Sequence, residues 1–100
     1  MKTAAQIWID FKKTEEIADR LDAIAGDMEN ARDDQFNPYL NEVNSAWDGE
    51  NSEKYLLKGN GIKGNIDSNA KNVKMVASTI REIAKNIYDA EMANIQIAED

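Results

Sequence analysis

The fold is decided by residues 62–87, IKGNIDSNAKNVKMVASTIREIAKNI. Branched apolar residues recur there at gaps of 4, 7, 3, 4, 3 and 4 positions. They are Ile62, Ile66, Val73, Val76, Ile80, Ile83 and Ile87. Gaps of three and four place side chains on one face of an α-helix. Asn69 occupies the skipped position, where a single polar residue can fix the register of paired helices. The stretch therefore predicts a long helix with one apolar face.

A second row of small residues runs beside the first. Ala70, Ala77 and Ala84 recur every seven residues and allow another helix to approach closely. The first half of the chain supplies such a helix, because it has an apolar row at gaps of four and three. That row is Ile17, Leu21, Ile24, Met28 and Ala31. We expect a first helix over about residues 10–46 and a second over about 52–97.

The first row slips by one position near Pro38 and resumes as Phe36, Leu40, Val43 and Trp47. Proline inside a helix removes a hydrogen bond and kinks the axis. The slip indicates either a bend in one helix or a restart, with Asn37 as N-cap and Pro38 at the first helical position. The helical spacing that persists after Pro38 favours one bent helix.

Residues 47–51 are expected to form the turn. Gly49 accepts a positive φ without strain, and Asp48, Asn51 or Ser52 can cap the second helix. A glycine-rich stretch at Gly59, Gly61 and Gly64 follows, and each glycine costs roughly 1 kcal/mol relative to alanine in a helix. We predict a continuous but weak helix there.

The two ends of the chain carry weaker patterns. Ile7, Ile9 and Phe11 alternate with other residues, which indicates a short extended lead-in, with Trp8 as a packing anchor. Residues 93–100 keep some apolar positions and either extend the second helix or form a frayed end.

These elements predict an all-α fold, an antiparallel two-helix hairpin that forms one domain over residues 1–100. The isoleucine and alanine rows together are wider than one helix contact. We therefore expect two hairpins to dimerise into a four-helix bundle. The expected dimer seam is Ile66, Val73, Val76, Ile80, Ile83 and Ile87.

Composition excludes several function classes. The 100 residues include no Cys and no His, so disulfides, thiolate metal sites and the commonest general base are absent. A net charge of −7 argues against nucleic acid and anionic lipid as partners. No apolar run approaches the roughly 18 residues that span a bilayer, so we expect no stable membrane insertion. No convergent polar set indicates an enzyme, a cofactor or a metal site.

Trp47-Asp48-Gly49 lies at mid-chain, at the strongest turn signal between the two predicted helices. By itself the motif is equally well explained as a tryptophan that closes the end of a helical hairpin. Tyr55 follows the tryptophan by eight residues, and Leu40 and Val43 precede it as apolar positions. On these residues the chain resembles, over essentially its whole length, the WXG family of the early-secretory-antigenic-target superfamily.

The resemblance implies a bacterial protein exported by a type VII (Esx/Ess-like) secretion system through a membrane ATPase, without a cleavable signal peptide. It implies a dimer with itself or with a WXG paralogue. It also implies a possible larger toxin partner and a role in virulence or interbacterial competition. Trp47 and Gly49 then belong to the export motif, which a C-terminal Tyr-x-x-x-Asp/Glu of the partner chain completes. Here Tyr88 is followed by Glu91 at the third position and by Met92 at the fourth. Both spacings keep an acid on the tyrosine's side of a helix.

Two other interpretations of the sequence stay open. One is a structural helical hairpin of a secretion needle, although that class usually turns through a proline-containing loop. The other is an acidic inhibitor or immunity-type protein, which only the charge supports. Tyr88 also has an alternative interpretation as a half-buried residue of the bundle.

Overall fold

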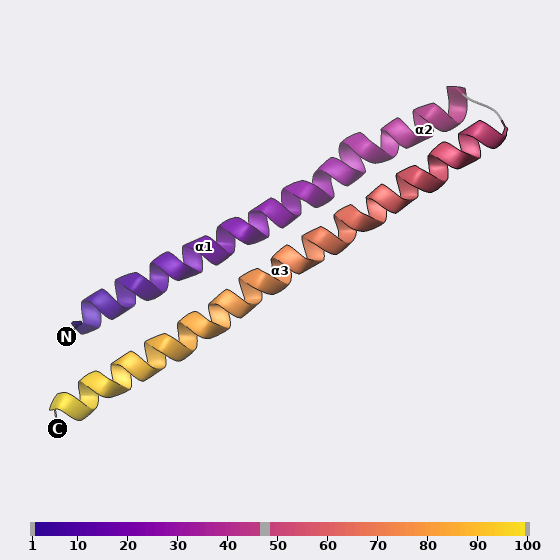
Figure 1. Cartoon of the computed structure of the whole chain (residues 1–100). Helices are drawn as coiled ribbons and strands as arrows, with labels where there is room; N and C mark the ends of the chain where they lie inside the picture. Colours follow the sequence, from indigo (N-terminus) through magenta and orange to yellow (C-terminus); the bar gives the residue numbers. More distant parts are fainter. Residues whose placement is uncertain (1, 47–48, 100) are drawn as a thin grey trace. The chain divides into compact units, whose positions relative to one another are not determined.

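The computed structural model describes residues 2–46 and 49–99, and these are helical almost throughout. The elements in chain order are α1 (Ala4–Ala31), the π-helix η1 (Arg32–Phe36), α2 (Asn37–Ala46) and α3 (Glu50–Glu99) (Figure 1). The described part of the chain contains no strand. The predicted all-α class is confirmed.

The chain divides into two compact units. Unit 1 joins Met1–Asp22 with Lys74–Asp100, and unit 2 is Ala23–Val73. In unit 1, Lys2 contacts Glu91 and Asp22 contacts Arg81, so the two segments run antiparallel. In unit 2, Arg32 pairs with Asp67 and Leu40 lies against Gly59, so its segments also run antiparallel. Unit 2 contains the turn and is a helical hairpin, as the sequence predicted.

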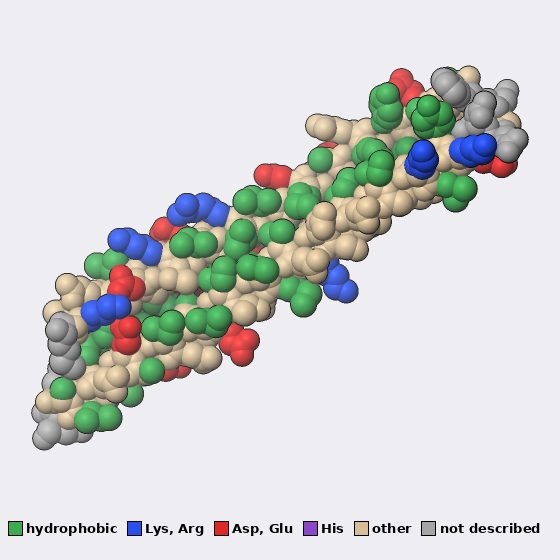
Figure 2. All heavy atoms as spheres, in the orientation of Figure 1, with side chains coloured by type: hydrophobic (Ala, Val, Ile, Leu, Met, Phe, Trp, Pro, Cys, Tyr) green, Lys and Arg blue, Asp and Glu red, His purple; other side chains and the backbone are tan. Residues whose placement is uncertain are grey.

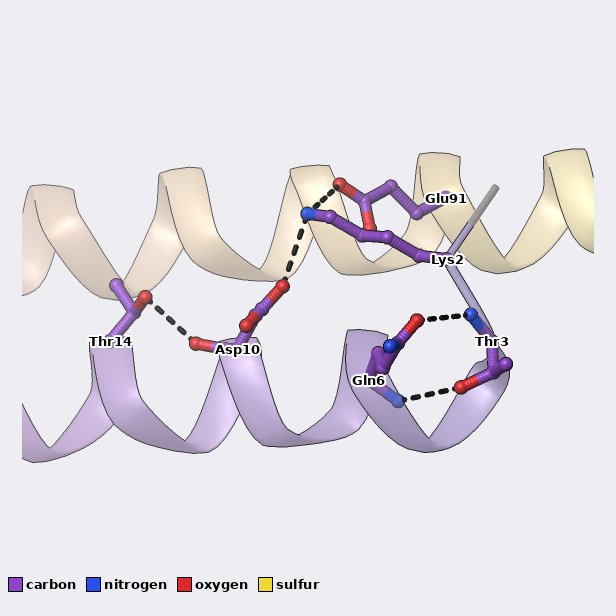
Figure 3. A network of polar contacts seen from close by, with 6 residues as sticks. All are labelled: Lys2, Thr3, Gln6, Asp10, Thr14 and Glu91. Carbon is purple, nitrogen blue, oxygen red and sulfur yellow. Dashed lines mark hydrogen bonds and ion pairs between the residues drawn. The ribbon is translucent and has the colours of Figure 1, made fainter.

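Helix α1 begins six residues earlier than expected, at Ala4 rather than near residue 10. Thr3 and Gln6 form a capping box (Figure 3). The Gln6 N–H donates to Thr3 Oγ1 at 3.2 Å, and the Thr3 N–H donates to Gln6 Oε1 at 2.9 Å. Two N–H groups that a helix start leaves without partners are thereby bonded. The expected extended lead-in at Ile7, Ile9 and Phe11 is wrong, because this cap starts the helix before it.

The predicted slip near Pro38 is real, and its cause is a π-turn. Residues Arg32–Phe36 form η1, which places one extra residue in the helix, and the Asn37 N–H bonds to the Arg32 carbonyl oxygen. Asn37 has φ −59° and ψ −47°, which is helical geometry rather than that of an N-cap. The alternative of a helix restart is therefore wrong, and the helical path continues into α2 without a break.

Gly49 has φ +83°, the positive value that the sequence predicted. Its carbonyl oxygen accepts the Glu53 N–H at 3.2 Å, so Gly49 is the residue that precedes α3. Asn51 and Ser52 lie inside α3, so the expectation that one of them caps this helix is wrong. The other candidate cap, Asp48, lies outside the described residues.

Helix α3 continues through the glycine-rich stretch, as predicted. Gly59 is buried, and a Cβ there would overlap the Leu40 side chain. The absence of a side chain at Gly59 therefore lets α2 and α3 approach closely. Gly61 and Gly64 have open space where a Cβ would lie, so no contact with the described residues accounts for them.

The buried core consists almost entirely of alanine. Apart from Ile7, every buried apolar side chain among the described residues is an alanine. These are Ala18, Ala25, Ala70, Ala77 and Ala84. They follow seven-residue intervals within each helix, so they line the face on which the helices meet. The row that the sequence analysis placed beside the apolar seam is thus the row that the chain itself buries.

Candidate functional site

Unit 1 has two flanks, one on each side of its alanine core. Each residue turns an α-helix by about 100°, so positions one before and four after a buried residue lie on opposite flanks. Ile83 lies one residue before the buried Ala84, and Tyr88 lies four residues after it. Helix α1 repeats the pattern, because Ile17 precedes the buried Ala18 and Asp22 follows it. Arg81 lies four residues after the buried Ala77, and its ion pair with Asp22 shows that the flanks following the alanines of the two segments lie side by side.

We call one flank the aromatic edge, formed by Trp8, Phe11, Lys12 and Tyr88. The Phe11 and Tyr88 ring centroids lie 5.0 Å apart, and those of Trp8 and Tyr88 lie 6.0 Å apart in an edge-on arrangement. These are favourable aromatic separations. Lys12 Nζ lies 4.6 Å from the Trp8 ring centroid, within cation–π range. The edge therefore joins side chains from α1 and α3 into one cluster.

The second candidate residue of the tail, Glu91, is held by a lysine near the other end of the chain (Figure 3). Lys2 Nζ lies 3.1 Å from Asp10 Oδ2 and 3.3 Å from Glu91 Oε1. Hydrogen bonds to Asp10 and then to Glu91 raise the pKa of the Lys2 ammonium. One positive charge thus stands between two carboxylates, and the trio keeps a net negative charge.

An open groove of about 270 Å³ brings these residues together. Its lining is mainly apolar, and polar side chains stand beside it. The apolar lining residues are Ile7, Phe11, Ile80, Ile83, Ala84, Ile87 and Tyr88, and the polar ones are Lys2, Asp10, Thr14 and Glu91. Tyr88 and Glu91, which the sequence singled out together, therefore line one groove. A concave apolar surface with a few polar groups suits an apolar side chain of a partner.

The other flank is the isoleucine edge, formed by Ile17, Val76, Ile83 and Ile87. Each of these side chains is about half exposed, from 48% for Ile17 to 52% for Val76 and Ile87. Unit 2 likewise leaves Ile24 and Ile62 half exposed. Figure 2 shows hydrophobic side chains on the outer surface of both helices. Exposed aliphatic side chains in such a row are typical of a surface that another protein covers.

The remaining residues of the predicted dimer seam lie closer to the helix contact. Ile66, Val73 and Ile80 have intermediate exposure. The seam therefore divides into partly buried residues next to the alanines and exposed residues on the flank. Three of these residues, Ile80, Ile83 and Ile87, line the groove together with Tyr88.

Arginine-centred ion pairs tie the helices together. Arg81 Nη2 lies 2.9 Å from Asp19 Oδ1 and 2.6 Å from Asp22 Oδ2, and these two carboxylates raise the pKa of Arg81. In unit 2, Arg32 pairs with Asp67 and with Asp33. The hydrogen bond from Arg32 lowers the pKa of Asp33. Each of these charged groups has a partner within its own helix or on the facing helix.

The candidate turn motif is described only in part. Trp47 lies outside the described residues, whereas Gly49 has the positive φ that the turn needs. Sequence reasoning did not predict that Trp8 contacts Tyr88 or that Lys2 pairs with Glu91. The available signal was the Thr3-Ala4-Ala5-Gln6 capping box, which extends α1 far enough to place both beside the end of α3.

The described part of the chain offers no group of three or more side chains suited to a metal ion. Within the same residues, no helix combines the length and the apolar character that crossing a membrane requires. Comparisons with protein-family models, curated proteins and solved structures found no match.

Proposed function

We propose that this chain is a small, non-enzymatic protein of the WXG type. In this proposal a type VII secretion system exports it as a substrate, a co-secreted partner or an adaptor for a larger toxin. The supporting observation is the groove in unit 1, where Tyr88 and Glu91 lie together despite their altered spacing. Gly49, with its positive φ immediately before α3, is consistent with a turn at Trp47-Asp48-Gly49.

The proposal includes a dimer in which the second copy covers the isoleucine edge. The chain buries alanines in its own core and leaves the larger branched residues half exposed. Fully burying an exposed side chain of this size stabilises by roughly 1.5–3 kcal/mol, so covering the remaining half of each one contributes about half of that, and the row together favours association. A second copy offers the same row in return, which is the pattern of a two-fold symmetric interface. A WXG paralogue with a similar row fits the same surface.

The first test is export in the native host, with and without the gene for the membrane ATPase of its type VII system. The tagged full-length protein is quantified in medium and cells. Export by this route means that the protein accumulates in medium only when the ATPase is present. Equal amounts in the medium of both strains would contradict the proposed function.

The second test examines the candidate export residues. Tyr88→Phe removes the hydroxyl and keeps the ring that packs on Phe11, and we expect it to reduce export. Tyr39→Phe is the matched control, because Tyr39 is 64% exposed and lies in the other unit. Trp47→Ala and Gly49→Ala probe the turn. If all of these variants reach the medium at the wild-type level, the export role of the motif is wrong.

Oligomeric state separates the remaining interpretations. Analytical ultracentrifugation of the wild type is expected to give a dimer, and Ile83→Glu, which places a charge on the isoleucine edge, is expected to give a monomer. A monomeric wild type would contradict the dimer. Growth into filaments would instead support the needle-like structural subunit.

A further inference from the structure

Trp8, on the aromatic edge, is held by contacts with neighbouring rings and yet remains exposed. Trp8 packs on Phe11 and Tyr88, yet 47% of its surface remains exposed. A single exposed apolar residue needs no explanation, but a tryptophan fixed within a cluster of rings is typical of the anchors of protein interfaces. The Trp8 ring loses little further freedom on binding, since neighbouring rings already restrict it.

The dimer leaves Trp8 free. A copy that covers Ile83 and Ile87 also covers the groove that Phe11 and Tyr88 line. Trp8 does not line this groove and lies on the opposite flank of the alanine core, so it remains available to another partner after dimerisation. Because Tyr88 belongs to both the cluster and the groove wall, a protein that contacts Tyr88 from outside the dimer also meets Trp8.

We propose that Trp8 is a further recognition residue of the export site, contacted together with Tyr88 by the same surface of the secretion machine, and that Lys2 is a positioning residue for Glu91. This inference rests on the proposed function. The export signal is then a surface that combines Trp8 and Lys2 with Tyr88 and Glu91. The C-terminal segment alone, without the first turns of α1, contains only Tyr88 and Glu91.

The chemistry of the surface defines what the secretion machine must offer. Lys2 leaves one carboxylate charge uncompensated beside the groove, and Arg81 leaves another between Asp19 and Asp22. A matching surface carries an apolar side chain for the Trp8 ring, with a lysine or arginine beside it. The complementary segment is therefore apolar and basic.

The test compares full-length variants in a host that exports the wild type in an ATPase-dependent manner. Trp8→Ala is expected to reduce the exported fraction at least about tenfold, because truncating a central aromatic anchor typically weakens an interface by that factor or more. Ile9→Ala is the matched control, since Ile9 lies in the same helical turn, is 50% exposed and lies outside the cluster. It is expected to be exported like the wild type.

A second variant separates recognition from folding. Trp8→Leu keeps a large apolar side chain and a good helix former but removes the ring. Circular dichroism is expected to show a Tm close to that of the wild type, and ultracentrifugation an unchanged dimer, while export stays low. Wild-type export of a folded Trp8→Leu would overturn the role of Trp8.

The role of Lys2 is tested by removing its positive charge and by restoring that charge with a different side chain. Lys2→Gln releases Glu91 and is expected to lower export, whereas Lys2→Arg keeps both ion pairs and is expected to restore it. Lys13→Gln, at an exposed position of α1, controls for the change in net charge. Equal export of Lys2→Gln and Lys13→Gln would overturn the positioning role. If the wild type needs the ATPase for export but Trp8→Leu and Lys2→Gln are exported normally, this inference is wrong and the proposed function stands. If the wild type is exported without the ATPase, the proposed function is wrong.

Discussion

Units 1 and 2 are built on the same alanine row but differ in how regular they are. In unit 1 the buried positions stand at regular helical intervals, because Ala77 and Ala84 are seven residues apart and Ile7 and Ala18 are eleven apart, close to three helical turns. Unit 2 has Ala25 and Ala70 at its core, yet it also contains the π-turn and three glycines of α3. In unit 1 the sequence keeps one helical repeat. In unit 2 the sequence departs from that repeat, and the π-turn and Gly59 restore the contact between the helices.

The two corrections in unit 2 have different physical origins. The π-turn at Arg32–Phe36 absorbs one surplus residue, so that Leu40 still faces α3. Gly59 then makes room for Leu40 at the point of closest approach. Unit 1 needs neither device, because its apolar residues and alanines already stand at helical intervals.

The largest expected effect comes from deleting one residue in each unit. Both deletions are made in a Pro38→Ala background, because removing the π-turn would otherwise leave Pro38 inside a regular α-helix. Deleting Lys13 turns the preceding residues by about 100°. This moves Ile7 and Phe11 off the core and costs roughly 3–4 kcal/mol of unfolding free energy. Deleting Gln35 removes the surplus residue of the π-turn and keeps Leu40 in place, so we expect a change below about 1 kcal/mol.

Urea denaturation followed by circular dichroism measures both deletions. The Pro38→Ala protein without a deletion is the reference. Equal losses for the two deletions would show that the π-turn does not hold a surplus residue.

Enlarging the alanine core is expected to have the next largest effect and to be similar in the two units. Ala77→Leu in unit 1 and Ala25→Leu in unit 2 each add three carbons where the side chain has no exposed surface. Overpacking of this kind costs roughly 1–3 kcal/mol. Ala93→Leu, at an exposed position of α3, is the control. A much smaller loss at Ala25 than at Ala77 would mean that the helices of unit 2 pack less closely.

The glycines of α3 are expected to respond to alanine in two ways. Gly61→Ala and Gly64→Ala meet open space and should each stabilise by about 1 kcal/mol, because alanine is the better helix former. Gly59→Ala should lose that gain, since its Cβ overlaps Leu40. Thermal unfolding of the three single variants gives the comparison. Stabilisation by Gly59→Ala equal to the other two would show that Leu40 moves aside freely.

The smallest effect concerns pH and belongs to unit 1. The folded state raises the pKa of Lys2 above its ordinary value of 10.5, so this group stabilises the fold below pH 10.5. That contribution is lost as pH rises through the raised pKa. The difference in Tm between the wild type and Lys2→Gln should therefore narrow on the alkaline side. A difference that stays constant across this range would contradict a stabilising ion pair at Lys2.

The sequence predicted the helices well because apolar spacing reports directly on which residues share a face. It identified α3, the slip before Leu40 and the positive φ of Gly49. It identified Ala70, Ala77 and Ala84 as a row for close helix approach, but not the matching buried alanines of the first helix, Ala18 and Ala25, since hydrophobicity ranks isoleucine above alanine. The structure buries alanine because small side chains allow close helix contact, which leaves Ile83 on the flank.

The candidate site was predictable in part. Tyr88 and Glu91 stand on one side of a helix at a spacing of three, and this is readable from the sequence. Their contacts with Trp8 and Lys2 depend on where α1 begins and on its pairing with α3. Such long-range pairing has no local signature, and alternation at Ile7, Ile9 and Phe11 pointed to the wrong element.

The alanine row has one further consequence, for the alignment of the two helices. A surface that repeats every seven residues offers nearly the same contact after a slide of one full repeat, so alanine alone leaves the alignment ambiguous. The side chains that occur once remove the ambiguity. Arg81 finds its two carboxylates, and Lys2 finds Glu91, in a single alignment. These surface charges add little to stability, but they select one alignment of the two helices over alignments shifted by seven residues.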